Sequence, residues 1–460
     1  MSEPGKYRDF LSRVEGVVFP APLLGYAAER LALQHQLQLT EWLSPEEMEV
    51  RQMAQLRYLL QHAKEHVPHY RIQLQDVDLA KPLTPDVWRS LPILTRDQVV
   101  SHDGRLDSAG VPASHGKIYE QSSSGSTGKP VRIKQTMLAN LYWQGITLRD
   151  HLWSDRSFRG KFAFIRHLES EAARRPEGVR NKAWGTSTRG IFPTGPSVGM
   201  HSTLDIDTQV EWLVREQPHY LLSYPSLVRG LLMHMEKNNV RLKNLTSVGT
   251  FGEVLDQPTR NLCRDQYGIK IADIYSSQET GYIALQCPDH DHYHIQSESA
   301  YVEILDKKNE SCAVGETGRV VLTPLHNFAS PLIRYEVGDY ATVGEPCDCG
   351  RGLPVLNEII GRTRNLLTHP DGRIHRPSVG IMSYRDLAPV QQVQLIQTTV
   401  DDVEVKIVMQ GKLTPDQDAK MRAEILDQLD HDFNIDIHYV DRIARGPTGK
   451  FEDFVSRVSA

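Results

Sequence analysis

Strands and helices alternate along the middle of the chain, and this pattern constrains the fold more than any other feature of the sequence. Short apolar runs predict buried strands, and the segments between them carry apolar residues at helical spacing. The predicted strands are 162–166, 245–250 and 269–277, and the predicted helices are 140–153, 209–216, 227–235 and 257–267. Alternation of this kind is typical of an α/β sheet with helices packed against it.

The last hundred residues have a different pattern. Two predicted strands, a helix and a third strand follow one another there, over 390–398, 403–409, 415–430 and 435–440. This order indicates a separate small α+β unit. We therefore expect a large N-terminal domain over residues 1–360 and a small C-terminal domain over residues 361–460.

A strong helix start lies near the N-terminus. Ser44 is a suitable N-cap, Pro45 fits the first turn, and Glu47 stands three residues after the cap. Apolar residues then recur at three- and four-residue steps as far as Val67. The pattern predicts one amphipathic helix that ends before Pro68.

Residues 122–130 read SSSGSTGKP and are rich in small hydroxyl side chains, glycine and backbone N–H groups. Together with Lys129 they offer the donors and the cation that grip polyphosphate. The stretch is not a Walker A loop, because only two residues separate Gly125 from Gly128. Residues 131–134 alternate apolar and charged, so we place the stretch between two strands as a hairpin-like flap. The alternative is a flexible Ser/Gly linker.

Composition limits the class of protein. The chain has 460 residues, of which 40% are hydrophobic and 24% charged, as in a globular protein with ample core. A net charge of -6 excludes a general polycationic surface for nucleic acid. The start of the chain lacks an apolar signal-peptide centre, and the longest weakly polar stretch, 16–28, is too short and broken to cross a bilayer. Five cysteines do not form a disulfide framework, and we expect a cytoplasmic protein. From its charge and hydropathy we expect no nucleic-acid partner and no membrane partner.

Five further stretches carry side chains suited to chemistry, two of them just past predicted strand ends, where α/β sheets bind ligands. They are TFGE at 250–253, YSSQETG at 275–281, RYEVGD at 334–339, GRTR at 361–364 and PTGK at 447–450. Each is weak by itself, since short motifs often match by chance. Their order together with the flap is far more specific.

In this order the six motifs resemble the adenylate-forming superfamily of acyl-CoA synthetases and carboxylate ligases. The resemblance is closer to the phenylacetate–CoA ligase branch and its capsule-biosynthesis (CapK-like) relatives, and it runs from about residue 45 to the C-terminus. It implies an α/β fold with a large N-terminal domain of packed mixed sheets and helices, which binds ATP and the acid. It also implies a small, mobile α+β lid that carries the catalytic lysine.

The resemblance implies an AMP-forming acid–thiol ligase that needs ATP and Mg²⁺. Such an enzyme forms an acyl-adenylate, releases pyrophosphate, and then transfers the acyl group to CoA. The protein has mainly to position the reactants and neutralise phosphate charge. Two other functions stay open: nucleotidyl transfer to a non-carboxylate acceptor, and nucleotide binding without catalysis.

Residue roles follow by position in the matching motifs. Lys450 matches the mobile lysine that reaches the acyl-adenylate, and Glu279 matches the glutamate that helps to hold Mg²⁺, so these are the catalytic residues. Arg364 falls at the hinge about which the lid would rotate between half-reactions. The implied ATP-binding residues are Ser123, Ser124, Gly125, Ser126, Thr127, Gly128, Lys129, Gly252, Glu253, Tyr275, Gln278, Asp339 and Arg362. Judged alone, Lys450 would be an ordinary solvated lysine near a C-terminus.

The sequence departs from the family pattern at three places. Gln278 stands where the family usually has threonine near the α-phosphate, and Ser276 replaces the usual glycine. Residues 365–375, after the hinge position, look more like the capsule-biosynthesis relatives. That region serves the second half-reaction, so an amine or a carrier-protein thiol remains an alternative to CoA.

The family's acyl pocket draws on the helix after the flap and on strand-end loops. Tyr142, Trp143, Tyr224 and Ser277 are therefore the substrate-binding candidates, with ordinary packing as the alternative. The expected substrate is a small carboxylic acid, aromatic or otherwise cyclic.

Two short ligand pairs indicate a structural zinc site. Cys287-x-x-His290 and Cys347-x-Cys349 can together close a tetrahedral set. Our first choice of ligands is these four residues, with His292 as the substitute for His290. The other interpretation is a histidine-rich surface turn and free thiols.

Overall fold

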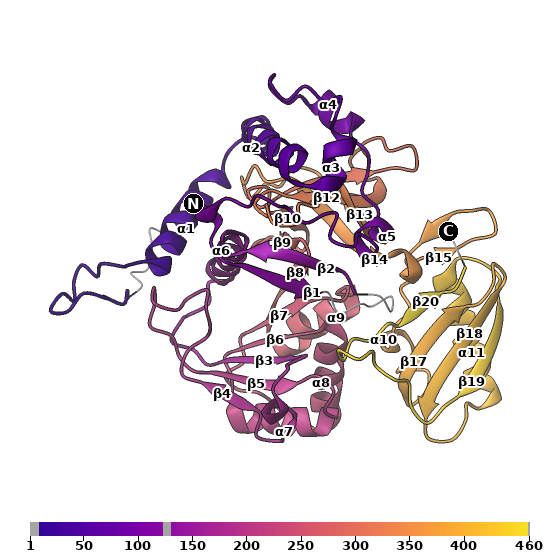
Figure 1. Cartoon of the computed structure of the whole chain (residues 1–460). Helices are drawn as coiled ribbons and strands as arrows, with labels where there is room; N and C mark the ends of the chain where they lie inside the picture. The colour runs from indigo at the N-terminus through magenta and orange to yellow at the C-terminus, as the bar shows by residue number, and fades with distance from the viewer. Residues whose placement is uncertain (1–8, 123–129, 459–460) are drawn as a thin grey trace.

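The computed structural model describes residues 9–122 and 130–458. Within these ranges the largest element is a mixed sheet of twelve strands that runs through the centre of the molecule (Figure 1). Across the sheet its strands are β11 (Ala300–Leu305), β12 (Thr317–Pro324), β13 (Tyr335–Val343), β14 (Val355–Arg362), β10 (Tyr293–Ile295), β9 (Gly281–Gln286), β8 (Lys270–Ser277), β7 (Ser247–Phe251), β6 (Tyr220–Ser223), β3 (Phe162–Arg166), β5 (Ser197–His201) and β4 (Val179–Asn181).

The sheet has a parallel and an antiparallel part, which meet at β8. Strands β5, β3, β6, β7 and β8 are parallel, whereas β8 pairs with β9 antiparallel, and the pairing stays antiparallel as far as β11. The predicted strands at 162–166, 245–250 and 269–277 are confirmed as β3, β7 and β8. The antiparallel strands were missing from the sequence-based prediction. The carboxyl ends of the parallel strands form one edge, the usual place for ligands in such sheets.

Helices cover both faces of the parallel part, and those predicted there are confirmed. On one face, Trp212 and Leu231 share a core with Val248, and on the other, Ile146 shares a core with Ile274. The first face carries α7 (Ile206–Glu216), α8 (Pro225–Lys237), α9 (Gln257–Asn261) and the π-helical turn η3 (Leu262–Gln266), and the second carries α1 (Tyr26–Thr40) and α6 (Met137–Trp153).

The antiparallel part is covered by helices from the N-terminal region. The predicted capping box is present, since Ser44 accepts from the Glu47 backbone N–H and Glu47 from that of Ser44. Leu56, Leu60 and Trp88 are fully buried in the core that these helices share with the sheet. The helices are α2 (Pro45–His66), α3 (Pro68–Gln73), α4 (Pro85–Ser90) and α5 (Arg96–Val100).

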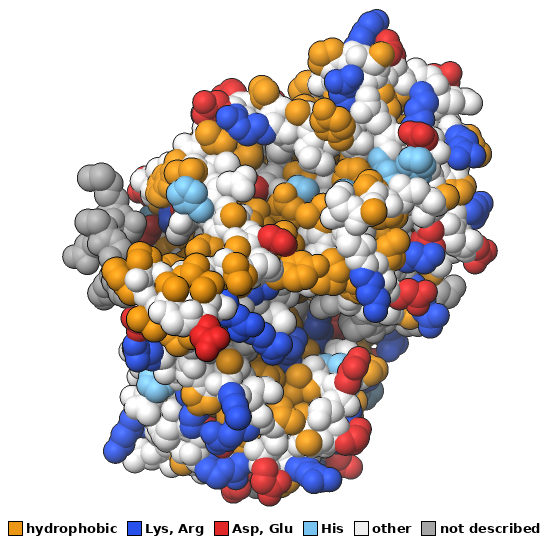
Figure 2. All heavy atoms as spheres, turned by 60° about the vertical axis from the view of Figure 1, so that its left-hand side comes forward, with side chains coloured by type: hydrophobic (Ala, Val, Ile, Leu, Met, Phe, Trp, Pro, Cys, Tyr) orange, Lys and Arg blue, Asp and Glu red, His pale blue; other side chains and the backbone are white. Residues whose placement is uncertain are grey.

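The segment before α1 adds apolar surface to the molecule. Figure 2 shows hydrophobic side chains gathered on the face that lies at the left of Figure 1, where this segment is found. Its exposed large apolar residues include Val17, Val18, Phe19 and Leu24.

None of the helices in the described ranges has the length and apolar character needed to cross a bilayer.

A two-stranded hairpin carries the predicted flap. Strands β1 (Ile118–Ser122) and β2 (Arg132–Thr136) pair antiparallel, with Ser122 opposite Arg132. The prediction that strands flank the serine-glycine stretch is therefore confirmed. The stretch itself, residues 123–129, lies outside the described residues.

The C-terminal region folds around its own core. Its four-stranded sheet has the order β19-β18-β17-β20, and Val393, Val405 and Ile425 are buried between this sheet and α11. The unit lies beside the parallel part of the large sheet (Figure 1). Its elements are β15 (Leu367–Thr368), β16 (Ile374–His375), α10 (Ile381–Tyr384), β17 (Val390–Gln397), β18 (Asp402–Met409), α11 (Pro415–Leu429), β19 (Asn434–Tyr439) and β20 (Phe454–Ser456). The three predicted strands and the predicted helix are confirmed as β17, β18, β19 and α11; β20, which pairs parallel with β17, was not predicted.

Candidate active site at the ends of the parallel strands

The C-terminal unit delivers Lys450 to the ends of the parallel strands. Gly252, just after β7, has a φ of +77°, and a β-carbon built there would lie 3.0 Å from the Nζ atom of Lys450. The same Nζ atom lies 5.8 Å from the centre of the Tyr224 ring, which follows β6. Glycine at 252 supplies both the left-handed backbone and the space for the lysine.

Charges of both signs surround the Lys450 ammonium. Burial lowers the pKa of Lys450, the carboxylate of Glu253 opposes that shift, and the guanidinium of Arg362 adds to it. Asp339 and Glu279 also favour the charged lysine. The structure thus brings together five residues from five separate motifs.

Asp339, Arg362 and Tyr275 form one connected group. Asp339 on β13 stands opposite Arg362 on β14, and the Asp339 Oδ1 atom lies 3.1 Å from Arg362 Nε. The Tyr275 hydroxyl donates to Asp339 Oδ2 at 2.8 Å. Both carboxylate oxygens are therefore held by neighbours, and the group is rigid and preorganised.

Glu279 is buried in the turn between β8 and β9, with 4% of its surface exposed. Its Oε1 atom lies 3.6 Å from Nη1 of Arg96, the first residue of α5. Arg96 was not among the predicted site residues. No motif surrounds it, and only the packing of α5 against β13 brings it to the site.

Gln278 ties the flap hairpin to the same turn. Its side-chain oxygen accepts from Gln121 Nε2 at 2.7 Å, and its backbone oxygen accepts from Gln135 Nε2 at 3.0 Å. Gln121 lies on β1 and Gln135 on β2, so both strands of the hairpin are fixed beside Glu279. The predicted phosphate-binding residues 123–129 belong to the connection between these strands.

Glu253 links the large sheet to the C-terminal unit. Its carboxylate accepts from the Phe451 backbone N–H at 2.7 Å and from the Ser226 N–H and hydroxyl at 2.9 and 3.1 Å. Burial raises the pKa of Glu253. Glu253 was predicted to bind ATP, but in this structure its carboxylate binds the backbone of Phe451, the residue after Lys450.

Arg364 lies in the short helix η4 (Thr363–Asn365), which directly follows the last strand of the large sheet. Its Nη2 atom lies 2.6 Å from Glu452 Oε1, two residues beyond Lys450. The predicted hinge residue is therefore joined to the segment that carries the lysine.

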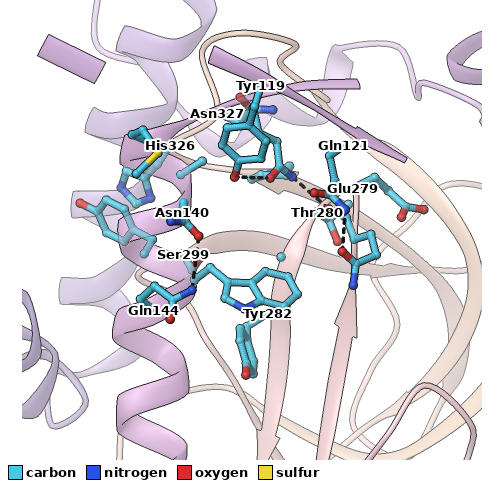
Figure 3. Close-up of a pocket in the computed structure, with 18 of the residues that line it drawn as sticks. Tyr119, Gln121, Asn140, Gln144, Glu279, Thr280, Tyr282, Ser299, His326 and Asn327 are labelled. Atoms are coloured by element: carbon cyan, nitrogen blue, oxygen red, sulfur yellow. Dashed lines mark hydrogen bonds between the residues drawn. The ribbon is translucent and has the colours of Figure 1, made fainter. Parts of the chain in front are cut away.

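A cavity of about 500 Å³ lies between α6, the flap hairpin and the β8–β9 turn (Figure 3). Tyr142 and Trp143, two of the four predicted substrate-binding residues, line it. Tyr224 and Ser277 are not among the described residues of its lining. Tyr224 is buried beside Lys450, and the Ser277 hydroxyl is paired with that of Thr280 at 2.8 Å.

Several lining residues carry polar side chains that the sequence analysis did not single out. No motif marks them, because α6, the residue before β11 and the segment after β12 contribute them separately. They include Asn140, Gln144, Ser299, His326 and Asn327.

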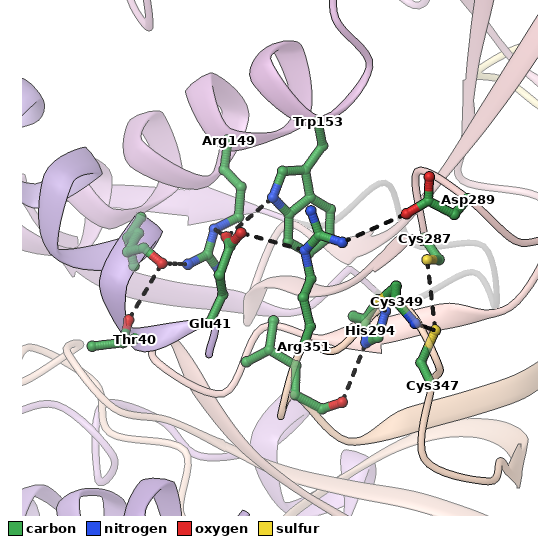
Figure 4. Close-up of polar contacts among 12 residues, drawn as sticks. Thr40, Glu41, Arg149, Trp153, Cys287, Asp289, His294, Cys347, Cys349 and Arg351 are labelled. Atoms are coloured by element: carbon green, nitrogen blue, oxygen red, sulfur yellow. Dashed lines mark hydrogen bonds and ion pairs between the residues drawn. The ribbon is translucent and has the colours of Figure 1, made fainter. Parts of the chain in front are cut away.

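A cysteine–histidine cluster forms away from this cavity, and it corrects the predicted ligand set (Figure 4). His294, rather than His290 or His292, lies with Cys287, Cys347 and Cys349; the four ligand atoms are within 4.8 Å of one another.

The correction has a structural reason. His294 is buried on β10, with its Nε2 atom 3.4 Å from Cys349 Sγ and its Nδ1 atom 3.2 Å from the Leu353 carbonyl oxygen. His290 lies on the preceding turn, where its Nε2 atom is 2.6 Å from Asp348 Oδ1.

The geometry of the cluster fits a tetrahedral metal. Zn–S bonds of about 2.3 Å and Zn–N bonds of about 2.05 Å require S–S and S–N separations of about 3.8 and 3.5 Å. The Cys287 and Cys347 sulfurs are 3.9 Å apart, and the Cys349 sulfur lies 3.4 Å from His294. The contact of His294 with Leu353 would also orient the ring for its metal, as second-shell partners do.

The sequence is similar to that of several known proteins. The family model described as the CapK C-terminal domain matches residues 368–457. The phenylacetate–coenzyme A ligase of Aromatoleum evansii is 24% identical over 411 residues, covering 86% of this chain and 89% of its own. The enzyme of the same name from Escherichia coli K12 is 25% identical, with 85% and 89% covered.

Solved structures share the fold. A 2-hydroxyisobutyryl-CoA ligase in its postadenylation state, in complex with R3-HIB-AMP, superposes with a TM-score of 0.70 at 16% identity, covering 90% of both chains. The same ligase in its thioesterification state, with 2-HIB-AMP and CoA, gives 0.56 at 16% identity and 97% coverage of both. In sequence, the chain is similar over most of its length to phenylacetate–coenzyme A ligases, and its residues 368–457 match the CapK C-terminal domain. Its fold is the one shared by adenylate-forming CoA ligases.

Proposed function

We propose that this chain activates a small carboxylic acid with ATP and Mg²⁺, releases pyrophosphate, and transfers the acyl group to CoA. The observation that carries the proposal is the position of Lys450 beside Gly252, among Asp339, Arg362 and Glu279. An ammonium held among these charges suits the moment when a carboxylate attacks the α-phosphorus of ATP. At that moment negative charge accumulates on the acid and on the phosphate together.

Lys450 would contact the acid and the α-phosphate during adenylation. Its ammonium is a compact charge on a flexible stem, and the side chain is half-buried. Low local polarity strengthens its attraction for the anionic transition state. Pyrophosphate then leaves towards the flap hairpin, whose strands Gln278 fixes beside Glu279.

The remaining residues would bind and orient ATP. Asp339, held by Arg362 and Tyr275, is suited to accept hydrogen bonds from the ribose hydroxyls. Glu279 offers the buried carboxylate oxygen that would hold Mg²⁺, which neutralises phosphate charge when bound. Arg96, 3.6 Å away, adds a second positive charge on the same side.

The domain division that we propose is 1–360 and 361–460, with Arg364 at the hinge. The separate hydrophobic core of the C-terminal region supports this division, and the last strand of the large sheet, β14, ends at Arg362, two residues beyond the proposed boundary. Because Lys450 fills the site from which the acceptor must reach the adenylate, the small domain would have to rotate between half-reactions. The higher TM-score with the postadenylation state of the related fold fits an arrangement that precedes such a rotation.

We further propose that Cys287, His294, Cys347 and Cys349 hold a structural Zn²⁺. The ligand distances support this set, and four protein ligands leave no open coordination position for a substrate. We also propose the cytoplasm as the location, since thiols stay reduced there.

The first test is acid-dependent exchange of labelled pyrophosphate into ATP, run over a panel of aromatic and short aliphatic acids. At least one acid is expected to support exchange. Folded protein that is silent with every acid would contradict the proposal.

A second test identifies the acceptor. Mass spectrometry of complete reactions distinguishes an acyl-CoA from an acylated carrier protein and from an amide, with free AMP in each case. A stable AMP adduct as the final product would instead indicate nucleotidyl transfer.

A further inference from the structure

The cavity beside Glu279 is polar, although the related ligases take phenylacetate, an acid with an unsubstituted ring. Glu279 lies at one end of the cavity and His326 at the other (Figure 3). Carboxamide side chains line the space between them: Gln121, Gln135, Asn140, Gln144 and Asn327. A pocket for a plain hydrocarbon ring is expected to be mostly apolar.

Part of this polar lining is committed to the protein itself. Gln135 Oε1 accepts from the Tyr119 hydroxyl at 3.1 Å, and Asn327 Nδ2 donates to the carbonyl oxygens of Lys134 and Ser330 at 3.0 and 3.1 Å. These two amides hold the flap hairpin in place. The other polar side chains of the lining do not take part in these hydrogen bonds.

Two other side chains keep hydrogen-bonding capacity. Asn140 Oδ1 accepts from Gln144 Nε2 at 3.3 Å, while Asn140 Nδ2 has no acceptor within the part of the chain that the structure describes. The His326 Nδ1 atom is buried and likewise has no partner among the described residues. Buried polar atoms without partners are rare in native proteins, and a water molecule or a ligand can supply the missing partner.

His326 is held in a fixed orientation. Its ring stacks on that of Tyr142, with centroids 3.4 Å apart and planes at 6°. Burial lowers the pKa of His326 to about 3, so its imidazole is neutral at physiological pH. A neutral imidazole offers one donor and one acceptor. The ring can therefore read either a hydroxyl or an amino group, or a ring nitrogen, at a set position.

We infer that the acid carries a hydroxyl, amino or ring-nitrogen group on the side away from its carboxylate, and that His326 and Asn140 select this group. The inference rests on the proposed ligase function and names its substrate class. An unsubstituted ring would offer no hydrogen-bond partner to the His326 ring or to Asn140 Nδ2, both of which belong to residues that line the cavity. A site built to form such hydrogen bonds rejects the analogue that lacks the polar group.

The test compares matched acids in the pyrophosphate exchange assay. Benzoate and phenylacetate are each paired with their hydroxy- and amino-substituted derivatives and with pyridine analogues. The best polar acid is expected to exceed its unsubstituted parent in kcat/KM by about 10- to 100-fold, the effect of one unsatisfied buried polar group. Equal kcat/KM values for parent and polar acids would overturn the inference and leave the ligase proposal intact.

Variants then assign the selection to the two residues. His326→Phe keeps the stacked ring and removes both nitrogens, and Asn140→Leu changes a second position on a different element. Each is expected to reduce the polar-to-parent ratio by about 10-fold or more, chiefly by slowing the polar acid. His326→Asn, which keeps a polar nitrogen near the position of Nδ1, is expected to retain part of the ratio. Unchanged ratios in both His326→Phe and Asn140→Leu, each with wild-type thermal unfolding, would overturn the assignment.

Direct binding separates failure of this inference from failure of the ligase proposal. If no acid supports exchange, titration calorimetry of the same acids with the wild-type chain and with His326→Phe still measures selection. Preferential binding of polar acids that His326→Phe abolishes would support the inference. Absent or unselective binding of the polar acids would overturn it.

Discussion

At the scale of single residues, the contact between Lys450 and Gly252 sets what the site can do. The glycine leaves a space that any side chain would fill, and the lysine occupies it. Gly449, just before the lysine, is also in the left-handed region with a φ of +85°, and a β-carbon there would lie 2.5 Å from Ser202 Oγ. The loop that presents Lys450 therefore depends on glycine on both sides of the contact.

Replacing Lys450 by alanine should slow adenylation by about 10²–10³-fold, because one preorganised charge is lost from the transition state. ATP binding should change little, since Asp339, Arg362 and Tyr275 remain. The rate of pyrophosphate exchange measures the effect on adenylation, and equilibrium ATP binding measures the effect on affinity. Lys420→Ala, on the exposed side of α11, is the control and should leave both unchanged.

The depressed pKa of Lys450 predicts the pH dependence of adenylation. The charged lysine is the active form, so activity is lost as pH rises through its pKa in the folded protein. Because burial lowers that pKa from 10.5, the alkaline limb should fall below pH 10.5. Glu253→Gln removes the carboxylate that opposes the shift and should move the limb to still lower pH. A pH–rate profile with its limb at or above 10.5 would contradict this assignment.

At the scale of elements, the cysteine–histidine cluster joins two connections of the large sheet. Cys287 and His294 flank the β9–β10 turn, and Cys347 and Cys349 lie between β13 and β14. Arg351, two residues on, lies 3.3 Å from Glu41 Oε1 and stacks on Trp153 with its carbon 4.7 Å from the ring centre (Figure 4). The cluster thus fixes a loop that also contacts the end of α1.

We expect about one zinc per chain, bound through His294 and the three thiols. His294→Ala or Cys349→Ser should release the metal and lower the melting temperature, because binding energy at a structural site adds to folding energy. His290→Ala is the matched control and should keep both. Metal analysis and thermal unfolding are the measurements, and a zinc content lost in His290→Ala but kept in His294→Ala would reverse the assignment.

At the scale of the whole molecule, a buried ion pair holds the small unit on the large one. Arg229 on α8 contacts Asp256 Oδ2 at 2.5 Å and Asp453 Oδ1 at 2.7 Å, and only 6% of its side chain is exposed. Asp453 lies three residues beyond Lys450, so this pair fixes the lysine loop in place. Glu253 and Ser202 add hydrogen bonds to Phe451 and Thr448.

Removing Arg229 should release the small unit. Arg229→Met leaves two acidic groups without their partner, a loss of about 3–5 kcal/mol for a buried pair. Adenylation should fall and small-angle scattering should show a larger radius of gyration. The Arg385→Ala control breaks the more exposed pair with Glu236, worth about 0–1 kcal/mol, and should change neither. If folded Arg229→Met showed the wild-type radius of gyration and the wild-type adenylation rate, the role of Arg229 in holding the small unit would be excluded.

The sequence by itself determined the local features. The cap at Ser44, the strands around the flap, the parallel strands β3, β7 and β8 and most of the small unit follow from hydrophobic period and turn chemistry, which act over a few residues. The motif order also indicated the superfamily. These features need no knowledge of which strand lies beside which.

Only the tertiary structure decided which distant residues meet. His294, and not the predicted His290, lies with the three cysteines because β10 pairs between β9 and β14. Local sequence does not reveal this strand order. Arg96 reached Glu279, and His326 reached Tyr142, through the packing of separate elements. Side-chain pairs of this kind depend on strand order and helix packing, which arise from burying the whole chain's apolar surface and not from any short segment.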